Sequence, residues 1–334
     1  EVLGYTGKPD SYYRAIINWV KQRYDLDVTK EMINFVPGIV PGIGMAMNSF
    51  TRPGDKVMIQ PPVYHPFAWV TTRNERTLVT NPLKWENGMY RMDLDAFREQ
   101  VKGCKLFILC NPHNPGGVVW TEDELRTVAE ICYEEKVLVF SDEIHADLTL
   151  PPYKHRPFAT ISEKAKMNSV TFMSPSKAFN MPGLAASHAI IFNEDLRARF
   201  RKFMDAGELD MGHVFAFLSV EAAYTHGTEW LDQCLAYIQG NIDYVDNFLK
   251  THAPRIKAIR PQASYLVWLD CRELGLNQEA LNDFFADKAH LALNDGAMFG
   301  KEGTGYMRLN VASPRSVIEQ AMKQLAEAYQ EMSF

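Results

Sequence analysis

The sequence predicts an α/β fold in which a large domain, built on a doubly wound and mostly parallel sheet, precedes a smaller α+β C-terminal domain. Three observations predict this fold. Short, continuously apolar segments alternate with helical segments in the first part of the chain, as expected for strands that helices cover on both faces. The strand–helix–strand spacing is typical of doubly wound sheets. The last third instead combines long helical segments with a few strands, which predicts a second domain.

The first part of the chain alternates strands and helices in order. Apolar strands are predicted over 33–36, 56–60, 77–80, 105–110, 137–141 and 169–174. Helices are predicted between them over 39–50, 66–74, 93–101 and 121–135. Asp93 is a candidate N-cap, and Thr121 with Glu124 forms the pattern of a capping box.

The last third begins with a long helical segment over about 214–249, which is interrupted near Gly227. Beyond it, strands and a further helix are predicted over 264–270, 278–288 and 306–312. The terminal helix is expected to begin with Ser313 as its cap and Pro314 in its first turn.

Length and composition fit a globular chain of two domains. The 334 residues correspond to about two domains, which we place at residues 1–252, including the linking helix, and at residues 253–334. With 46% hydrophobic and 23% charged residues, the chain is not intrinsically disordered. Its net charge of −6 gives no indication of a nucleic-acid partner. The longest apolar stretches, such as 106–110, are too short to cross a membrane.

Cysteine usage predicts a cytoplasmic protein without a bound metal. The chain has five cysteines, an odd number, and none of them belongs to a CxxC pair. This pattern favours reduced thiols over a disulfide framework or a zinc site.

Ligands of α/β sheets bind beyond the carboxyl ends of the strands, and several polar residues follow predicted strands here. Each has an ordinary structural interpretation: Lys177 as a solvated loop lysine, Asp142 as an ion-pair partner or cap, and Asn114 as a turn residue. Tyr64 is equally a packing aromatic, and His145 a core or rim histidine. Together they match pyridoxal phosphate, which needs an amine for its aldehyde, a carboxylate for its ring nitrogen, a donor for its ring oxygen and a stacking face.

Four motifs strengthen this interpretation: NPHNPGG, SDEIHADL, SPSKAFNMPGL and YMRLNVASPR. They closely resemble fold-type I pyridoxal-phosphate enzymes of the class I and II aminotransferase group. Within this group, the forms NPHNP, SDEIH and FVPGIVPGI look most like the C–S lyases of the MalY/PatB (cystathionine β-lyase) type. The resemblance covers essentially the whole chain. It implies an aspartate-aminotransferase-like fold, bound pyridoxal 5'-phosphate and a small amino-acid substrate.

The resemblance implies a role for each matching residue around the cofactor ring. Lys177 would bind the aldehyde and shuttle protons, and Asp142 would pair with the pyridinium nitrogen. Asn114 and His145 would contact the ring 3-oxygen, and Tyr64 would stack on the ring.

The same resemblance implies contacts to the phosphate and the substrate. The backbone N–H groups of Ile39 and Val40, at the start of a helix, and the Ser174 hydroxyl would bind the phosphate. Arg308 would bind the substrate carboxylate in a two-pronged pair. Tyr5 would reach the phosphate of the neighbouring subunit's cofactor, which implies a homodimer with shared active sites.

Two features depart from the family pattern. Ala185 stands eight residues after Lys177, where many relatives have an arginine on the phosphate. Either the helix dipole, hydroxyls and Tyr5 meet the phosphate charge, or the cofactor binds more weakly. The sequence begins inside the family pattern, at GYTGKP, so the N-terminal part of the small domain is expected to be absent from it.

The resemblance implies β-elimination, in which cystathionine or a cysteine-type amino acid yields pyruvate, ammonia and a thiol. A class I/II aminotransferase is the alternative, because the same lysine, aspartate and asparagine serve both reactions. A serine acyl hydrolase would use the S-x-x-K pattern at 174–177, but the S-D-N and K-T-G elements are missing. A non-catalytic, cofactor-dependent regulatory protein is a further alternative, against which the intact Lys177, Asp142, Asn114 and Arg308 argue.

Overall fold

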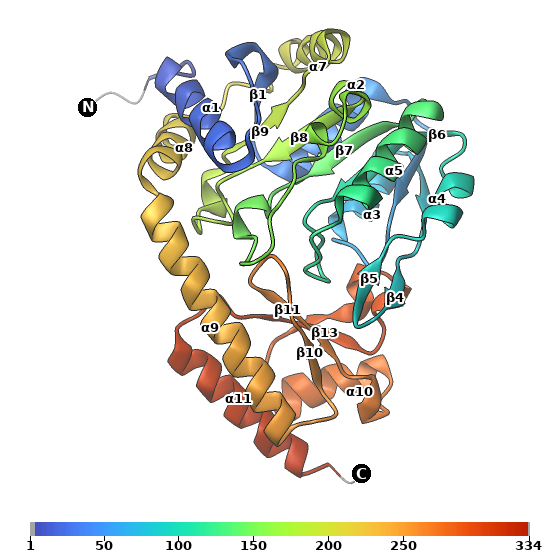
Figure 1. Cartoon of the computed structure of the whole chain (residues 1–334), viewed down its shortest axis with the longest axis vertical. Helices are drawn as coiled ribbons and strands as arrows, with labels where there is room; N and C mark the ends of the chain where they lie inside the picture. Colours follow the sequence, from blue (N-terminus) through green and yellow to red (C-terminus); the bar gives the residue numbers. More distant parts are fainter. Residues whose placement is uncertain (1–3, 333–334) are drawn as a thin grey trace.

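The structure, a computed structural model, describes residues 4–332. Its large sheet has seven strands in the order β1-β9-β8-β7-β6-β2-β3 (Figure 1). These strands are β1 Ile33–Val36, β2 Lys56–Ile59, β3 Thr77–Thr80, β6 Cys104–Cys110, β7 Leu138–Asp142, β8 Ser169–Met173 and β9 Ser187–Ile190. Neighbouring strands from β3 to β8 run parallel, whereas β9 is antiparallel to both β8 and β1. The predicted α/β fold with a mostly parallel sheet is confirmed.

Helices cover both faces of this sheet, because its central strands are apolar at successive positions. In β6, Leu106 and Ile108 pack on one face, while Phe107 and Leu109 pack on the other. The first face is covered by α2 Ile39–Phe50, α3 Pro66–Arg73 and α7 Glu194–Ala206. The opposite face is covered by α4 Leu94–Gln100, α5 Glu122–Glu134 and α6 Glu163–Met167. Near β1, two further helices pack against each other: α1 Asp10–Tyr24 and α8 Val214–His226.

Two predicted helix caps are confirmed. Asp93 accepts a hydrogen bond of 3.2 Å from a backbone N–H in the first turn of α4. Thr121 and Glu124 form the capping box of α5. Both satisfy N–H groups that have no acceptor within their helix.

Other local features differ from the prediction. The predicted elements include neither α1 nor β9, and β9 has only four residues, Ser-His-Ala-Ile, without a continuous apolar run. The expected cap at Ser313 is wrong. The last helix, α11 Arg315–Gln330, begins after Pro314, and no side chain caps it. Pro314 has a ψ of 141°, which keeps this residue and Ser313 before it outside the helix.

A second, antiparallel sheet lies in the lower half of Figure 1, with the strand order β10-β11-β13-β12. Its strands are β10 Lys257–Ile259, β11 Leu266–Asp270, β12 Asn294–Asp295 and β13 Tyr306–Asn310. The long helix α9 Thr228–His252 runs from the upper part of the molecule along this sheet, and α10 Gln278–Asp283 lies with α11 beside it. A hairpin of β4 Lys84–Glu86 and β5 Met89–Arg91 projects from the upper part toward it. The predicted boundary between residues 252 and 253 falls at the C-terminal end of α9.

Aromatic side chains hold the two parts of the molecule together. Trp268 of β11 is fully buried, and its Nε1 donates a hydrogen bond of 3.2 Å to the hydroxyl of Tyr90 in β5. The same ring stacks on Tyr306 of β13, with 5.3 Å between the centroids. Residues of the small sheet therefore keep a defined position relative to the large sheet.

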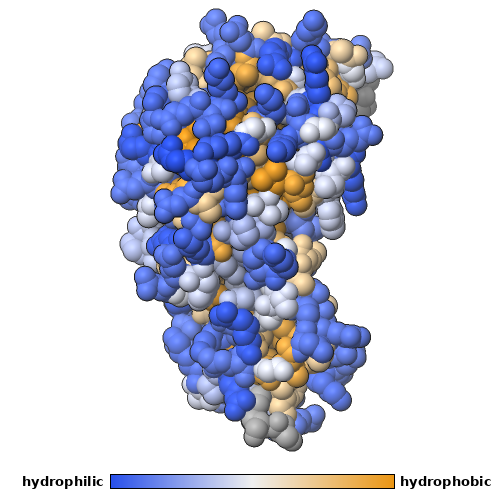
Figure 2. Space-filling model, turned by 90° about the vertical axis from the view of Figure 1, so that its right-hand side faces the viewer, coloured by the Kyte–Doolittle hydropathy of each residue, from blue (hydrophilic) through white to orange (hydrophobic). Residues whose placement is uncertain are grey.

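Figure 2 shows hydrophilic residues over most of one face of the molecule, with apolar residues visible between them. Within residues 4–332, no helix is both long and apolar enough to cross a membrane.

Candidate active site

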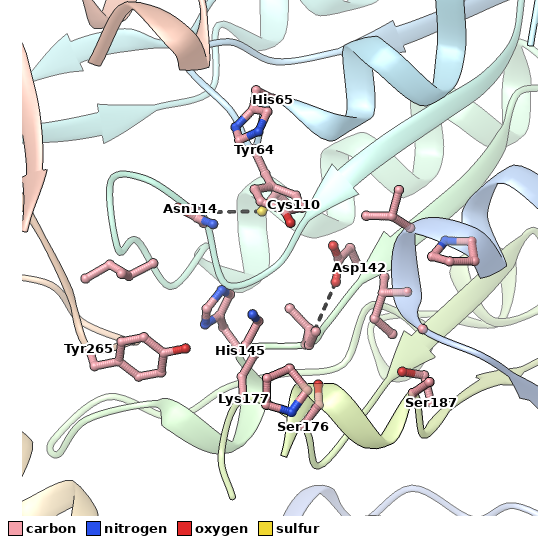
Figure 3. A pocket seen from close by; sticks show the side chains of 18 of the residues that line it. Tyr64, His65, Cys110, Asn114, Asp142, His145, Ser176, Lys177, Ser187 and Tyr265 are labelled. Atoms are coloured by element: carbon pink, nitrogen blue, oxygen red, sulfur yellow. Dashed lines mark hydrogen bonds between the residues drawn. The ribbon is translucent and has the colours of Figure 1, made fainter. Parts of the chain in front are cut away.

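A cavity of about 490 Å³ lies between the two sheets, beyond the carboxyl ends of β6, β7 and β8. Figure 3 shows side chains from several elements directed into it. The cavity brings together eight residues that the sequence predicts at a site: Ile39, Val40, Tyr64, Asn114, Asp142, His145, Lys177 and Arg308. Residues of both sheets line this cavity, so the site forms only when the two sheets are packed together.

Asp142 is the last residue of β7 and is 3% exposed. It accepts a hydrogen bond of 3.1 Å from the backbone N–H of Ile144. Two other buried carboxylates follow in this segment, and both have partners within the protein. Glu143 binds Ser141, His155 and the backbone N–H of Phe158. Asp147 accepts hydrogen bonds from Trp19 and Tyr24 and forms an ion pair with Arg23. Across the part of the chain that the structure describes, Asp142 forms no ion pair.

Burial is the main cause that raises the pKa of Asp142 to about 7. The Ile144 N–H and the Lys177 ammonium oppose this rise, and the Glu143 charge adds to it. A buried carboxylate without a partner is costly. The site is therefore suited to a ligand that places a cationic group against Asp142.

Lys177 lies in the loop after β8 and is half-buried. Figure 3 shows its side chain directed into the cavity beside His145. Burial is the main cause that lowers the pKa of the Lys177 amine; the Arg308 charge lowers it further, and the Asp142 charge opposes this. A lysine whose neutral form is favoured is a stronger nucleophile toward an aldehyde.

His145 and Tyr64 lie on opposite sides of the cavity in the view of Figure 3. His145 is buried, and its Nδ1 has no hydrogen-bond partner among residues 4–332. Burial, followed by the charges of Lys177 and Arg308, lowers the pKa of His145 to about 3, so its ring is neutral at physiological pH. Tyr64 is held edge-on against Phe67, with 5.7 Å between the ring centroids.

Arg308 of β13 is held in place by two amides. Its Nη1 donates to Asn114 Oδ1, and its Nη2 donates to Asn294 Oδ1, each at 2.8 Å. The guanidinium also lies over the ring of Phe299, 4.6 Å from the centroid. Burial lowers the pKa of Arg308 to about 10, which leaves it charged at neutral pH. A cation fixed in this way is suited to bind a carboxylate.

The N-terminus of α2 forms another part of the wall. The backbone N–H groups of Ile39 and Val40 point out of the first turn, where a helix provides no acceptor. Gly38, before them, gives no side-chain cap and has a φ of 128°, which favours glycine. Gly42 lets the helix approach β1, because a Cβ there would lie 2.9 Å from a methyl carbon of Val36. Free N–H groups at a helix start are suited to bind an anion.

Three further residues singled out in the sequence concern the expected phosphate site. Two of them, Ser174 and Tyr5, do not line the cavity, whereas Ala185 does. Ser174 does not line the cavity, and its hydroxyl donates to the carbonyl of Ala186 at 2.7 Å. Tyr5 is 98% exposed and does not line the cavity of its own chain. The roles of Ser174 and Tyr5 at a phosphate remain predictions. Ala185 lines the cavity with a left-handed φ of 46°, so this part of the wall carries no guanidinium.

The sequence prediction missed seven polar residues of the wall: His65, Cys110, Ser176, Ser187, Tyr265, Asn294 and Asn310. Cys110 ends β6 and Ser176 precedes Lys177, so the strand-end rule that identifies Asp142 could have found them. Ser187 begins β9, which has no clear sequence signal. Tyr265 directly precedes β11 and Asn294 begins β12, and only tertiary packing brings them to the cavity.

Comparisons with known proteins identify a family model, curated relatives and a solved structure that match nearly the whole chain. The family model for aminotransferase class I and II matches residues 3–325. The chain is 38% identical to cystathionine β-lyase PatB of Bacillus subtilis, over 98% of this chain and 85% of that protein. It is 30% identical to protein MalY of Escherichia coli, over 98% of this chain and 84% of MalY. The crystal structure of cystalysin from Treponema denticola, which contains pyridoxal 5'-phosphate, matches with a TM-score of 0.97 at 35% identity, over 100% of this chain and 85% of cystalysin.

Proposed function

Because the chain belongs to the class I and II aminotransferase family, we propose that it is a pyridoxal-phosphate-dependent carbon–sulfur β-lyase. Its substrates are cystathionine or related cysteine-type amino acids. One observation carries this proposal: Asp142 is a buried carboxylate without an ion-pair partner in residues 4–332, and it shares a cavity with the half-buried amine of Lys177. The name of the relative PatB supports the lyase reaction over transamination.

The residues present fit the cofactor. Asp142 would hold the protonated ring nitrogen, which supplies the missing cation. His145, whose Nδ1 has no hydrogen-bond partner within the described part of the chain, and the amide of Asn114 would face the ring 3-oxygen. The two free N–H groups at the start of α2 would hold the phosphate. Ser176, on the wall beside Lys177, is a further hydroxyl for this phosphate.

When bound, pyridoxal 5'-phosphate supplies an aldehyde for amino groups and a ring that withdraws electrons from the substrate's α-carbon. Arg308 holds the substrate carboxylate and so orients the Cα–H bond. The Lys177 amine takes the α-proton, which its lowered pKa permits. Asp142, as a carboxylate, keeps the ring nitrogen protonated. The bond between the β-carbon and sulfur then breaks, and overall one water is consumed while a thiol, pyruvate and ammonia are released.

An assay with cystathionine distinguishes the lyase from the aminotransferase. We expect the holoenzyme to release pyruvate and a thiol without any added keto acid. A strict requirement for a keto acid acceptor would identify a transferase instead. Protein that binds the cofactor but releases no keto acid from any sulfur amino acid would favour a non-catalytic role.

The variant Lys177→Ala tests the central residue. We expect it to lose pyruvate release and the visible absorption of the lysine-bound cofactor, because no other lysine among residues 4–332 lines the cavity. Full activity of this variant would contradict the site assignment.

The serine acyl hydrolase alternative finds no support, since the Ser174 hydroxyl donates to the carbonyl of Ala186 and does not line the cavity.

The assembly and location belong to the same proposal. The protein is a homodimer in which Tyr5 of one subunit completes the phosphate site of the other. Support comes from the 98% exposure of Tyr5, whose side chain is not packed against residues 4–332 of its own chain. The protein acts in the cytoplasm, which is supported by five cysteines that all lie in the described residues and form no disulfide.

A further inference from the structure

His113 lies directly before Asn114 in the turn after β6, but it does not line the cavity. Its side chain is buried. The backbone N–H of His113 donates to the carbonyl of Val118 at 2.8 Å, which closes the turn. The imidazole ring packs against Tyr90 and Trp120, with 5.9 and 5.4 Å between the centroids. The position of this ring is therefore tied to the position of the turn that carries Asn114.

The His113 ring forms a hydrogen bond to a second segment of the chain. Its Nε2 lies 2.9 Å from the carbonyl oxygen of Pro62. A carbonyl oxygen can only accept, so Nε2 carries the hydrogen and donates it. The other ring nitrogen, Nδ1, is buried and has no partner among residues 4–332. Burial lowers the pKa of His113 to about 4, against the opposing effect of the Pro62 carbonyl, so the ring is neutral at physiological pH.

This hydrogen bond connects the two segments that carry Tyr64 and Asn114. Pro62 precedes Tyr64 by two residues, and His113 precedes Asn114 by one. Both Tyr64 and Asn114 line the cavity, as Figure 3 shows. Side chains of a site keep a productive geometry only when residues behind them hold them in place. His113 is placed to do this for two side chains at once.

We propose, on the basis of the cofactor-dependent function above, that His113 is a positioning residue that fixes the separation between Tyr64 and Asn114. That separation sets the space for a flat cofactor ring, on which Tyr64 would stack and whose ring oxygen Asn114 would face. Loss of the His113 donor leaves the carbonyl of the buried Pro62 without this partner and lets the two segments move apart. Because Asn114 Oδ1 also accepts from Arg308 Nη1 at 2.8 Å, the same movement loosens the guanidinium.

Three variants separate the hydrogen bond from the shape of the side chain. His113→Gln keeps an N–H donor at the reach of Nε2, because both nitrogens are the same number of bonds from Cβ. His113→Asn carries the same amide one bond closer to the backbone, and His113→Leu has no donor. The probe is pyridoxamine 5'-phosphate, which binds the cofactor-free protein without a bond to Lys177. We expect His113→Asn and His113→Leu to raise its Kd about tenfold, and His113→Gln to stay within about twofold of the wild type.

The holoenzyme should show the same order in its kinetics. With cystathionine as substrate, we expect KM to rise about threefold or more in His113→Leu, because Arg308 is held less firmly, and to recover in His113→Gln. His188→Leu is the matched control. His188 of β9 is also buried, lies outside the cavity, and neither of its ring nitrogens has a partner among the described residues. This variant removes a buried imidazole without removing a hydrogen bond, so Kd and KM should not change.

The outcomes distinguish this inference from the proposed function. A merely structural role of His113 would lower the unfolding temperature of its variants and leave the Kd of the folded protein unchanged, which overturns the inference alone. A Kd raised equally in His113→Gln and His113→Leu also overturns it, because the donor would then have no effect. If His113→Leu does not fold, the comparison of His113→Gln with His113→Asn decides. If the wild type does not bind the probe, the cofactor proposal fails and the inference fails with it.

Discussion

At the scale of single residues, Asp142 and Glu143 are adjacent and buried but differ in their partners. Glu143 is satisfied within the protein, by the Ser141 hydroxyl and His155 at 2.7 Å each and by the Phe158 N–H at 2.9 Å. Asp142 has one backbone donor and faces the cavity. Glu143 directly follows the last residue of β7, and its carboxylate binds the Ser141 hydroxyl and does not line the cavity. Only one of the two carboxylates is therefore available to a ligand.

The raised pKa of Asp142 predicts a pH dependence of stability in the cofactor-free protein. Its pKa is about 7 when folded and 3.8 as the ordinary value, so the folded state binds this proton more tightly. The free energy of unfolding therefore falls as the pH rises from about 4 to about 7. Asp142→Asn cannot ionise, and we expect it to be more stable than the wild type at pH 8 by up to about 4 kcal/mol.

Thermal unfolding of the two cofactor-free proteins at pH 4 and pH 8 measures this effect. The stability difference should be small at pH 4, where Asp142 is protonated in the folded state and slightly less than half-protonated when unfolded. An equal difference at both pH values would mean that Asn stabilises for another reason, and would contradict the pKa argument.

Asn294 positions Arg308, and this predicts a selective kinetic effect. Asn294→Ala removes one of the two amide acceptors of the guanidinium. A hydrogen bond to a charged group contributes about 1.5–3 kcal/mol, so we expect KM for the amino acid to rise about tenfold or more while kcat changes little. Steady-state kinetics measure both values, and Asn247→Ala, at an exposed asparagine of α9, is the control. A fall in kcat with an unchanged KM would assign Asn294 another role.

At the scale of elements, α2 carries the proposed phosphate site only because it packs closely on the sheet. A Cβ on Gly42 would lie 2.9 Å from Val36 Cγ2 and 3.3 Å from Phe172 Cε1. The helix would have to move away from β1, and its N-terminal N–H groups would move with it. The glycine at this position therefore links the packing of the helix to the geometry of the site.

This link predicts that Gly42→Ala lowers stability by about 1–3 kcal/mol and weakens cofactor binding, because the added methyl group overpacks the core. Urea unfolding and a cofactor titration measure the two effects. Gly240→Ala in α9 is the matched control: its Cβ would meet only the end of the Arg315 side chain, at 3.4 Å. That variant should gain about 0.5–1 kcal/mol from the higher helix propensity of alanine. Cofactor binding unaffected by Gly42→Ala would separate the packing of α2 from the site.

At the scale of the whole molecule, the proposed exchange of Tyr5 between subunits can be tested with hybrid dimers. Lys177→Ala and Tyr5→Ala each damage both sites of their own homodimer. In a hybrid, one site lacks both side chains and the other has both, provided that Tyr5 acts across the interface. Equal mixing after dissociation and reassociation should restore about a quarter of the wild-type activity, because half of the dimers are hybrids with one intact site each.

Activity in the mixture that does not exceed the sum of the two variants would show that Tyr5 acts within its own chain or in no site. Light scattering during size-exclusion chromatography supplies the control, since the hybrids require a dimer in each preparation. A monomeric wild-type protein would contradict the shared site directly.

The main features of the fold follow from local patterns in the sequence. Continuous apolar segments predict six of the strands in the large sheet, because strands covered on both faces must be apolar at every position. The caps at Asp93 and Thr121 are also predictable from local sequence, since each side chain accepts a hydrogen bond from a backbone N–H in the first turn of the helix that it precedes. β9 escapes prediction because four residues, with a histidine and a serine among them, become a strand only through pairing with β1 and β8.

The sequence by itself determined the family and the side chains that follow the parallel strands, because strand ends of one sheet meet at one edge whatever surrounds them. Tertiary structure alone decided which of those side chains lack partners. It gave Glu143 partners within the protein but left Asp142 facing the cavity, and it bonded the Ser174 hydroxyl to the Ala186 carbonyl. It also placed Asn294 beside Arg308, which is distant in the sequence. Partnership depends on packing between distant segments, and no local pattern encodes it.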